Sequence, residues 1–505
     1  MSAQPPARPG RPRERPREIR TLLVANRGEI ARRVMRTAHV MGIRTVAVHS
    51  DPDTSAPHVA DADLAVPLGG ASAAESYLDR AKILDAARRS GADAVHPGYG
   101  FLAENAEFAE ECAAAGLNFV GPSPEAIRAM GLKHRAKQLA REAGVPVLPD
   151  GQITTEDRND WRAAADLVGY PLMVKAVAGG GGTGMRLVGN GGHDGRALVD
   201  AVESARREAQ GAFGDDRVFL ERYLRGPRHV EVQVFGDLAG NVLHLLEREC
   251  SIQRRHQKVV EEAPSPAVSP QLRARMGEAA LALARALGYA GAGTVEFLLD
   301  QHGTFYFLEM NTRLQVEHPV TEEVTGLDLV RMQLEVAQGH PLPVSQADIA
   351  ARGHAIEVRL YAENPARGFA PSFGPLWTYR HAATAREVPG IRYEDGVAAG
   401  GEISPFYDPM LGKVIAHAAT RTEAALRLRR ALAGMRLHGP ATNRDFLVAL
   451  LDDPDFLAGE TSTAYIETHP GLRSPGVPGQ AAGSPTVAHL VAAVAVTAHR
   501  RRAAS

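Results

Sequence analysis

The sequence predicts an α/β fold in three parts: an N-terminal parallel α/β domain, a small lid around a glycine loop, and a C-terminal region of mixed α+β structure. Strand and helix patterns alternate over residues 19–143, which indicates a parallel sheet. A run of glycines lies between two short strands within residues 144–222, and alternating strands with helices fill residues 223–470. A chain of 505 residues is too long for one ordinary core, so several domains are expected.

Residues 1–18 are rich in proline and arginine, and this composition predicts a disordered leader. The folded chain is expected to begin at Ile19 with a strand over 21–25, an amphipathic helix over 29–40 and a strand over 45–49. A helix over 76–89 and a strand over 93–96 continue the alternation. The turn that follows the first strand lacks G-x-G-x-x-G, so it is not a dinucleotide fingerprint.

The predicted lid contains short strands over 171–177 and 185–188 on either side of the glycine loop. Residues 471–505 are expected to form a linker and tail, because 473–485 are rich in proline, glycine and serine. The stretch 486–504 predicts a short helix that has nothing to pack on in its own segment. It is either a frayed tail or the start of a module absent from this chain.

Composition describes a soluble globular protein, with 44% hydrophobic and 23% charged residues. The net charge of −2 gives no electrostatic reason to expect binding to nucleic acid or to a membrane. Cys112 and Cys250 form neither a disulfide framework nor a zinc pattern, which favours a reducing, cytoplasmic location. No apolar run approaches the ~20 residues of a membrane span, and the start lacks the apolar core of a signal peptide.

The most informative stretch runs from Glu309 to Glu323, after a predicted β-hairpin over 293–308 that turns at 300–303. Glu296, on the opposing strand, would bring a second carboxylate near Glu309. Carboxylates and an amide are the oxygen ligands that suit Mg²⁺. A solvated strand face opposite a buried one is the commoner alternative for any alternating strand. If the extended path continues past Glu309, the period of two places five polar residues on one face: Glu309, Asn311, Arg313, Gln315 and Glu317.

The glycine loop, Gly179–Gly184, is not a Walker P-loop, because it lies between two strands and lacks the following Lys-Ser/Thr. Its backbone N–H groups could still close over a phosphate, since no Cβ stands in the way. An isolated glycine run would favour a plain flexible hairpin. Lys175, just before the loop on the same strand, favours a nucleotide site instead.

Two charged features remain open on the residues alone. Residues 254–258, Arg-Arg-His-Gln-Lys, are by default a solvated loop, but they would also supply the positive density that a transferring phosphoryl group requires. Arg359 shares a strand face with Glu357, and a guanidinium beside Glu317 would suit anion binding and proton removal. The alternative for such an Arg–Glu pair is a surface ion pair of little energetic consequence.

The run from Glu309 closely resembles the signature of the biotin carboxylases, the ATP-grasp enzymes that carboxylate biotin. The similarity extends from about Thr21 to about Pro470. It rests on further motifs in the family's order, namely Ala25–Ala31 (ANRGEIA), His96–Leu102 (HPGYGFL), Arg254–Glu262 (RRHQKVVEE) and Tyr407–Met410 (YDPM). One such match would be weak, whereas this many in order are highly specific.

The resemblance implies the ATP-grasp fold and ATP- and bicarbonate-dependent carboxylation of biotin N1′ on a carrier protein. The reaction would pass through carboxyphosphate and release ADP and phosphate. Glu317 would be the base, Arg313 and Lys258 would meet bicarbonate, and Arg359 would stabilise the biotin enolate. Mg²⁺ or Mn²⁺ would be held by Glu296, Glu309 and Asn311.

The same resemblance assigns the remaining site residues. ATP would be bound by Lys133, Lys175, Gly180, Gly181, Gly182, Gly184, Glu221, Arg222, Leu224, His229, Gln253 and His256. Biotin and bicarbonate would contact Tyr99, Lys258, Arg313, Gln315, Val316, Glu317 and Arg359. On the residues alone, the Glu221–Leu224 segment is only a strand exit, so its assignment rests wholly on the resemblance. Cys250 would border the cavity as a small buried residue and not as a nucleophile.

The chain departs from the family in its glycine loop, where Thr183 replaces a basic residue and Ala178 replaces a glycine. A catalytically impaired ATP-binding scaffold is therefore one alternative function. Another ATP-grasp ligase, which passes an acyl phosphate to an amine, is a second. A nucleic-acid binder is the weakest, because it rests on the arginine-rich leader alone.

The family also implies partners: a biotin carrier, a carboxyltransferase subunit and a second copy of the chain in a homodimer. No Ala-Met-Lys-Met biotinylation hairpin occurs in this sequence. The carrier is therefore expected on a separate chain, or on a continuation of this one. The unpartnered helix predicted after the linker favours the continuation. The downstream acyl-CoA or keto acid is not encoded here.

Overall fold

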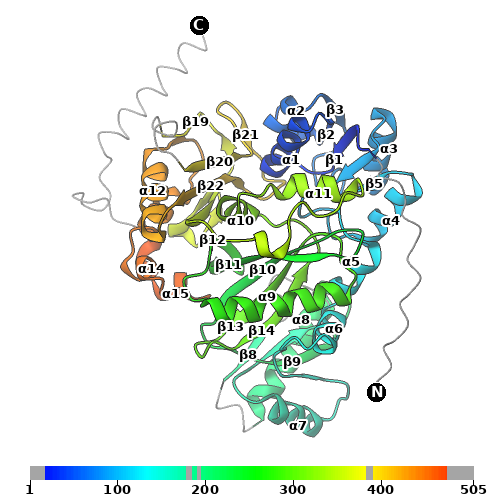
Figure 1. The fold of residues 1–505 in the computed structure, drawn as a ribbon. Helices are drawn as coiled ribbons and strands as arrows, with labels where there is room; N and C mark the ends of the chain where they lie inside the picture. Colours follow the sequence, from blue (N-terminus) through cyan, green and yellow to red (C-terminus); the bar gives the residue numbers. More distant parts are fainter. Residues whose placement is uncertain (1–17, 178–184, 190–194, 383–389, 475–505) are drawn as a thin grey trace, which may run out of the picture.

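The computed structural model describes residues 18–177, 185–189, 195–382 and 390–474. The predictions for the leader, the glycine loop and the C-terminal tail therefore fall almost wholly outside the described residues. Figure 1 shows three parts, as the sequence predicted: an N-terminal α/β domain, a protruding lid and a large mixed region. Among the described helices, none is long and apolar enough to cross a bilayer.

The N-terminal domain is built on a parallel sheet of order β3-β2-β1-β4-β5, with helices around it. Its strands are β1 Thr21–Val24, β2 Arg44–His49, β3 Leu64–Pro67, β4 Ala94–His96 and β5 Asn118–Phe119. Its helices are α1 Gly28–Val40, α2 Pro57–Asp61, α3 Arg80–Ser90, α4 Ala106–Ala114, α5 Pro124–Gly131 and α6 Lys133–Glu142. The predicted start of α3 at Ser76 was four residues early, because the Asp79 side chain accepts from the Lys82 N–H and caps the helix there.

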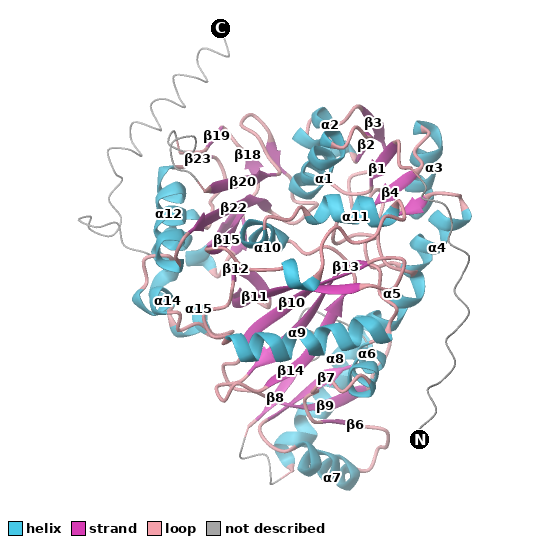
Figure 2. Ribbon diagram, viewed as in Figure 1, coloured by secondary structure: helices cyan, strands magenta, loops and turns pink. Residues whose placement is uncertain are grey.

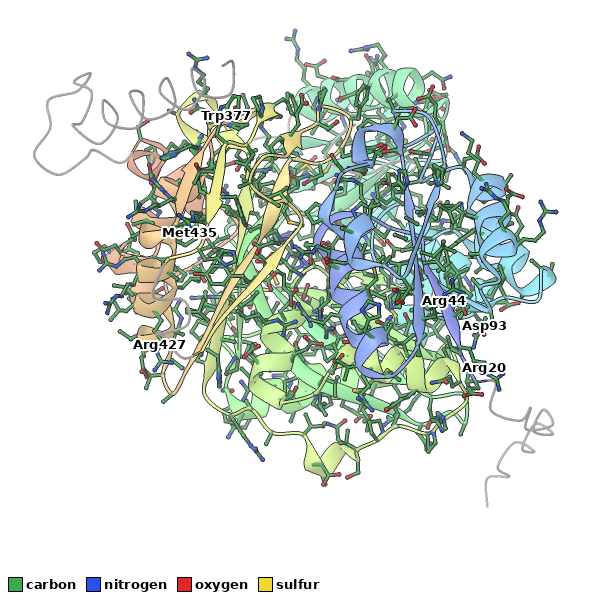
Figure 3. All side chains as sticks on the ribbon, turned by 90° about the horizontal axis from the view of Figure 1, so that it is seen from above. Arg20, Arg44, Asp93, Trp377, Arg427 and Met435 are labelled. Atoms are coloured by element: carbon green, nitrogen blue, oxygen red, sulfur yellow. The ribbon has the colours of Figure 1, made fainter. Side chains whose placement is uncertain are left out.

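The chain enters this sheet at its edge, where Figure 3 shows Arg20, Arg44 and Asp93 together. The Asp93 carboxylate accepts from the Arg20 N–H at 3.1 Å, and the Arg20 carbonyl accepts from the Arg44 N–H at 2.9 Å. These bonds fix the first described residues beside β2 and β4.

The lid is a four-stranded sheet of order β6-β9-β7-β8 with two helices. Its elements are β6 Asp150–Gln152, α7 Arg158–Val168, β7 Leu172–Ala176, β8 Arg186–Val188, α8 Arg196–Phe213 and β9 Val218–Arg222. It has its own small core, in which Trp161 of α7 packs with Leu172 of β7 and Val202 of α8. β7 and β8 form the predicted antiparallel pair around the glycine loop.

The C-terminal region is organised by an eight-stranded antiparallel sheet of order β14-β13-β10-β11-β12-β15-β22-β20. These strands are β10 Arg228–Gly236, β11 Val242–Arg254, β12 Gln257–Ala263, β13 Gly291–Leu299, β14 Phe305–Asn311, β15 His354–Tyr361, β20 Ile391–Asp395 and β22 Met410–Ala418. Helices cover both faces (Figure 2), including α9 Pro270–Ala286, α10 His318–Thr325, α11 Leu329–Ala337 and α12 Arg421–Gly434. One core joins Val24 of β1 and Ile30 of α1 to Phe235 of β10, so the N-terminal domain packs directly on this sheet.

Smaller elements complete the fold. The helices are α13 Arg444–Leu450, α14 Pro454–Ala458 and α15 Tyr465–Thr468, with 3₁₀ turns at Asp51–Asp53, Gln346–Asp348, Pro365–Arg367 and Pro470–Arg473. The short strands are β16 Glu363–Asn364, β17 Ala370–Pro371, β18 Gly374–Pro375, β19 Thr378–Arg380, β21 Glu402–Ile403 and β23 Arg436–His438.

Candidate active site

A cavity of about 930 Å³ lies where the N-terminal domain, the lid and the large sheet meet. Nearly all the predicted residues line it: Tyr99, Lys175, Glu221, Arg222, Leu224, His229, Gln253, His256, Lys258, Glu296, Glu309, Asn311, Arg313, Gln315, Val316 and Arg359. Glu317 lies behind its wall, fully buried. Lys133 lines a neighbouring cavity of about 590 Å³ between α6 and the lid. Gly180, Gly181, Gly182 and Gly184 lie outside the described residues.

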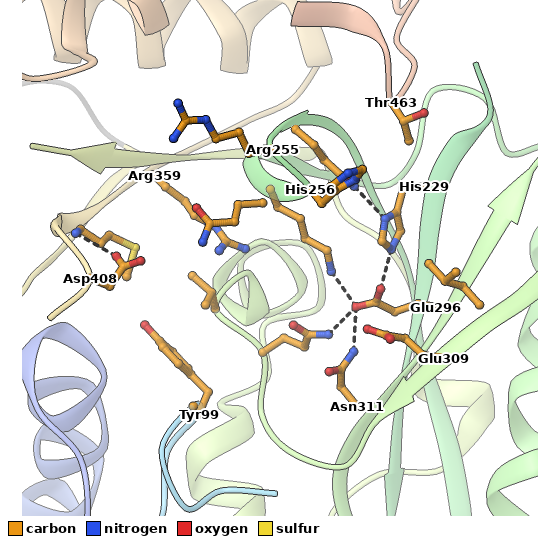
Figure 4. A pocket seen from close by; sticks show the side chains of 18 of the residues that line it. Tyr99, His229, Arg255, His256, Glu296, Glu309, Asn311, Arg359, Asp408 and Thr463 are labelled. Atoms are coloured by element: carbon orange, nitrogen blue, oxygen red, sulfur yellow. Dashed lines mark hydrogen bonds and ion pairs between the residues drawn. The ribbon is translucent and has the colours of Figure 1, made fainter. Parts of the chain in front are cut away.

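The β13–β14 hairpin places Glu296 directly opposite Glu309, as the alternation predicted. Glu296 Oε1 accepts from Asn311 Nδ2 at 2.8 Å and from Gln315 Nε2 at 2.9 Å (Figure 4). Burial alone would raise the pKa of Glu296, but Lys258 and His229 outweigh it and hold that pKa well below its usual range. Glu296 is therefore ionised at neutral pH.

Glu309 is exposed to the cavity, yet neighbouring atoms desolvate its carboxylate enough to raise its pKa, and the charge of Glu296 adds to this effect. Two facing carboxylates repel each other unless a cation lies between them. Hard oxygen ligands of this kind suit Mg²⁺ or Mn²⁺. The predicted set of Glu296, Glu309 and Asn311 therefore fits a divalent cation by its chemistry.

The chain does not stay extended past Asn311, so the single face that an extended path would carry on through Arg313, Gln315 and Glu317 does not form. β14 ends at Asn311, and α10 begins at His318 with Pro319 in its first turn. Proline's fixed φ suits a helix start. The intervening loop nevertheless folds back on the site, because Gln315 reaches Glu296 and Arg313 Nη2 donates to Asn311 Oδ1 at 3.0 Å.

The basic run splits into an inner and an outer part. Arg255 and His256 form the two-residue turn between β11 and β12, with φ of +47° and +63°. Arg254 is buried, stacks over Tyr361 at 4.5 Å and pairs with Glu363. Only part of the run is therefore a solvated loop.

Lys258 is the residue of the basic run whose charge lies at the centre of the site. Its ammonium contacts three carboxylates: those of Glu231, Glu296 at 2.8 Å and Glu317 at 2.7 Å. One half-buried cation thus lies among three buried acids. This arrangement gives Lys258 an electrostatic role over the whole centre.

Glu317 lies between two cations. Its Oε1 accepts from Lys258, and its Oε2 accepts from Arg359 Nη2 at 3.1 Å. Burial would raise the pKa of Glu317, but Lys258 and Arg359 reverse the effect and keep it well below its usual range. Arg359 Nε also donates to Glu261 at 2.6 Å, so the guanidinium bridges two glutamates.

His229 is oriented by Gln253. The Gln253 amide nitrogen donates to the Cys250 carbonyl at 2.9 Å and to His229 Nδ1 at 2.8 Å. On the other side of the ring, His229 Nε2 lies 2.7 Å from Glu296. Cys250 is buried and its thiol pKa is raised by burial, consistent with a small buried residue.

Charged residues that sequence reasoning missed hold the predicted ones. Lys137 of α6 contacts Glu221, which also contacts Lys175. The i, i+4 spacing from Lys133 to Lys137 could have indicated it. Glu104 accepts from Arg313 Nε at 2.8 Å, and its position far along the chain gave no signal.

Arg248 is the deepest of the missed residues. Its guanidinium is fully buried and donates to Glu231 at 2.5 Å, to Gln233 at 2.7 Å and to Thr321 at 3.0 Å. The available signal was a run of three charged residues, 247–249, in the middle of β11.

Replacing Glu261 by glutamine is expected to change how stability varies with pH. Burial raises the pKa of Glu261 from 4.5 to about 7, in spite of Arg359. The folded state then holds this proton more tightly than the unfolded state, so the wild type loses stability as pH rises through this window. Urea midpoints at intervals from pH 5 to pH 8 should fall more steeply for wild type than for E261Q. Parallel curves would contradict the assignment.

Comparison with known families agrees with this architecture. Residues 18–127 match the model for the biotin carboxylase N-terminal domain, and residues 357–468 match the biotin carboxylase C-terminal domain. Residues 133–345 match the ATP-binding domain of the carbamoyl-phosphate synthase L chain. The fold is that of an ATP-grasp enzyme.

Individual proteins narrow the class. The chain is 49% identical to a biotin carboxylase of Halalkalibacterium halodurans over 89% of its own length and 98% of that protein. It is also 49% identical to the mitochondrial methylcrotonoyl-CoA carboxylase alpha subunit of Arabidopsis thaliana, over 89% of its length but only 61% of that subunit. The biotin carboxylase domain dimer of Hydrogenobacter thermophilus 2-oxoglutarate carboxylase, in complex with MgADP, ADP and bicarbonate, superposes with a TM-score of 0.85 at 43% identity, covering 91% of this chain and 100% of that one.

The chain belongs to the biotin carboxylase family. It spans about 61% of the length of the plant carboxylase subunit that it matches.

Proposed function

We propose that this chain carries out the first half-reaction of an acyl-CoA carboxylase, in which ATP and bicarbonate carboxylate biotin N1′ on a carrier to give carboxybiotin, ADP and phosphate. The observation that carries this proposal is the placement of Glu317 between Lys258 and Arg359, beside the facing carboxylates of Glu296 and Glu309. A base, two anion-binding cations and a metal-ligand pair thus share one cavity wall.

Glu317 is assigned as the base that removes the bicarbonate proton. In this structure, Lys258 and Arg359 make its carboxylate a weak base. Bicarbonate and the γ-phosphate are anions that would compete for those two cations. Their binding would draw positive charge away from Glu317 and raise its pKa toward that of a useful base. The deprotonated bicarbonate would then attack the γ-phosphorus to form carboxyphosphate.

Arg313 and Arg359 are assigned to different stages of the reaction. Arg313, steadied by Glu104 and Asn311, orients bicarbonate. Carboxyphosphate then releases CO₂ and phosphate, and phosphate takes the biotin N1′ proton. Arg359 stabilises the oxygen of the resulting ureido enolate, which captures CO₂, while closure of the site keeps water from both intermediates.

Lys133 and Lys175 are assigned to the ATP phosphates. Glu221–Leu224 are assigned to the adenine ring, and the rest of the nucleotide is assigned to His229, Gln253 and His256. Lys175 contacts Glu221 in this structure, so phosphate binding would exchange one anionic partner for another. Mg²⁺ or Mn²⁺, held by Glu296, Glu309 and Asn311, would neutralise phosphate charge and align the γ-phosphate.

The wider assembly is also a proposal. Full-length relatives of the chain are alpha subunits of acyl-CoA carboxylases, and the solved Hydrogenobacter domain is described as a dimer. These likenesses support a homodimer that works with a biotin carrier, on the same chain or another, and with a carboxyltransferase. We assign the protein to the cytoplasm because its two cysteines, Cys112 and Cys250, are unpaired, which suits a reducing compartment.

Replacing Glu309 by glutamine is expected to raise the Mg²⁺ concentration for half-maximal turnover by at least about 10-fold, because a charged metal ligand is lost. Titration of activity with Mg²⁺ at saturating ATP measures this. Asp300, in the turn at the other end of the same hairpin, supplies the control variant Asp300→Asn. An unchanged Mg²⁺ requirement in E309Q would remove Glu309 from the metal site.

Phosphate release by the purified chain tests the function itself. With Mg²⁺-ATP, release should require bicarbonate and should rise when free biotin is added. An ATP-grasp ligase of another kind would not show this pair of dependences. A folded protein that binds ATP without turnover would support the scaffold alternative. Placing arginine at position 183 would then show whether the glycine-loop departure is the cause.

A further inference from the structure

Lys413 is a lysine in the middle of β22, fully buried and outside every role assigned above. It lies opposite Arg359 of β15 in the antiparallel register. Directly opposed residues point to the same face of a sheet. Ile415, two residues further along β22, packs with Val320 of α10, so this face is the one that α10 covers. Lys413 therefore lies beneath the start of α10, next to the catalytic arginine.

The Lys413 ammonium joins two walls of the site. It donates to the Val316 carbonyl at 2.6 Å and lies 3.2 Å from Glu29 Oε1 of α1. Glu29 in turn accepts from the Tyr99 hydroxyl. Val316 and Tyr99 both line the cavity, and Val316 immediately precedes Glu317. One buried cation thus contacts the loop that carries the base and, through Glu29, the opposite wall.

Two other acids lie near Lys413, but neither is its hydrogen-bond partner. Glu394, opposite Lys413 on β20, is bonded to Arg36 and Arg392. Glu357 lies on the same sheet face, fully buried, and its carboxyl oxygens make no hydrogen bond. A buried ammonium is costly unless it is paired and hydrogen-bonded. The partners that the structure gives Lys413 are the Glu29 carboxylate and the Val316 carbonyl, which makes its position specific.

We propose that Lys413 is a positioning residue for biotin carboxylation. By holding the Val316 carbonyl, it fixes the plane of the peptide that links Val316 to Glu317, and so the direction from which Glu317 projects. The inference rests on the proposed function of Glu317 as base. Lys413 does not touch the reacting atoms.

Two substitutions separate the hydrogen bond from the charge. Lys413→Met removes both, whereas Lys413→Gln keeps a donor for the Val316 carbonyl. Lys82→Met is the matched control, because Lys82 donates to the Glu75 carbonyl at the same 2.6 Å on the protein surface. Each variant is assayed for kcat and for KM of bicarbonate with free biotin, and its Mg²⁺-ATP affinity is measured by calorimetry.

K413M is expected to lower kcat by about 10²-fold, the effect of misplacing a catalytic group by about 1 Å, with unchanged Mg²⁺-ATP affinity. K413Q should lie between K413M and wild type, and K82M should equal wild type. Wild-type kcat in K413M would overturn the proposal, as would equal loss of turnover and ATP affinity in both variants. If K413M does not fold, K413Q tests the proposal alone. The proposal then requires that K413Q lowers kcat while its Mg²⁺-ATP affinity stays at the wild-type value. Absence of bicarbonate-dependent turnover in wild type would instead overturn the proposed function.

Discussion

Glu317→Gln is expected to lower kcat for bicarbonate-dependent ATP cleavage by about 10²–10⁴-fold, the range for loss of a general base. Glutamine keeps the shape of the side chain and can still accept from Arg359, so the fold and the ATP site should survive. What disappears is the group that takes the bicarbonate proton. Steady-state phosphate release, with Mg²⁺-ATP affinity measured alongside, gives both quantities.

Glu278→Gln is the control for this experiment. Glu278 lies on the surface of α9, and within the described part of the chain its one ion pair is with Arg285. E278Q should match wild type. The assignment of Glu317 fails if E317Q retains wild-type kcat. It also fails if kcat and ATP affinity fall together, since that pattern describes a collapsed site and not a missing base.

Lys258→Met is expected to have the largest combined effect on activity and stability. The substitution leaves the buried carboxylates of Glu231, Glu296 and Glu317 without their shared cation. Breaking a buried ion pair by removing one partner typically costs about 3–5 kcal/mol. Activity should be lost as well, because the same ammonium is assigned to the transferring anions. Urea unfolding of wild type and variant measures the stability difference.

The stability difference between wild type and K258M should change with pH in one direction. Lys258 helps to hold the pKa values of Glu296 and Glu317 below the 4.5 of an ordinary glutamate. Their ion pairs therefore contribute stability above about pH 4.5 that is lost as pH falls, when the carboxylates protonate. The gap between wild type and K258M should narrow in acid. Arg285→Met, on the surface of α9, should have the same stability as wild type. A stability difference between wild type and K258M that is equal at all pH values would contradict the assignment of these ion pairs.

Local patterns predicted much of the fold. The alternation around residues 300–303 placed Glu296 opposite Glu309, because strand register follows directly from hairpin geometry. The sequence left open where β14 ends, because its alternation continues beyond Asn311, the last residue of the strand. Helix caps such as Asp79 set boundaries that hydrophobic periodicity does not show.

The groups that tune the site were not predictable in the same way. Glu104, Glu261 and Lys413 come from three separate parts of the chain and meet the catalytic residues only in the folded protein. Each would pass for an ordinary charged residue in its own segment. Glu261 and Lys413 matter because they are buried among charged groups, and the exposed Glu104 matters because it contacts Arg313; all three effects depend on tertiary packing.

Transfer of label from ¹⁴C-bicarbonate to free biotin tests the central claim most directly. The purified chain, with Mg²⁺-ATP, should form acid-labile carboxybiotin. The amount should be proportional to the ADP released, once the ADP released with bicarbonate but without biotin has been subtracted. E317Q should form none above background. ATP cleavage without transfer of label to biotin, in protein whose fold and ATP binding are intact, would contradict the assignment of this site to biotin carboxylation.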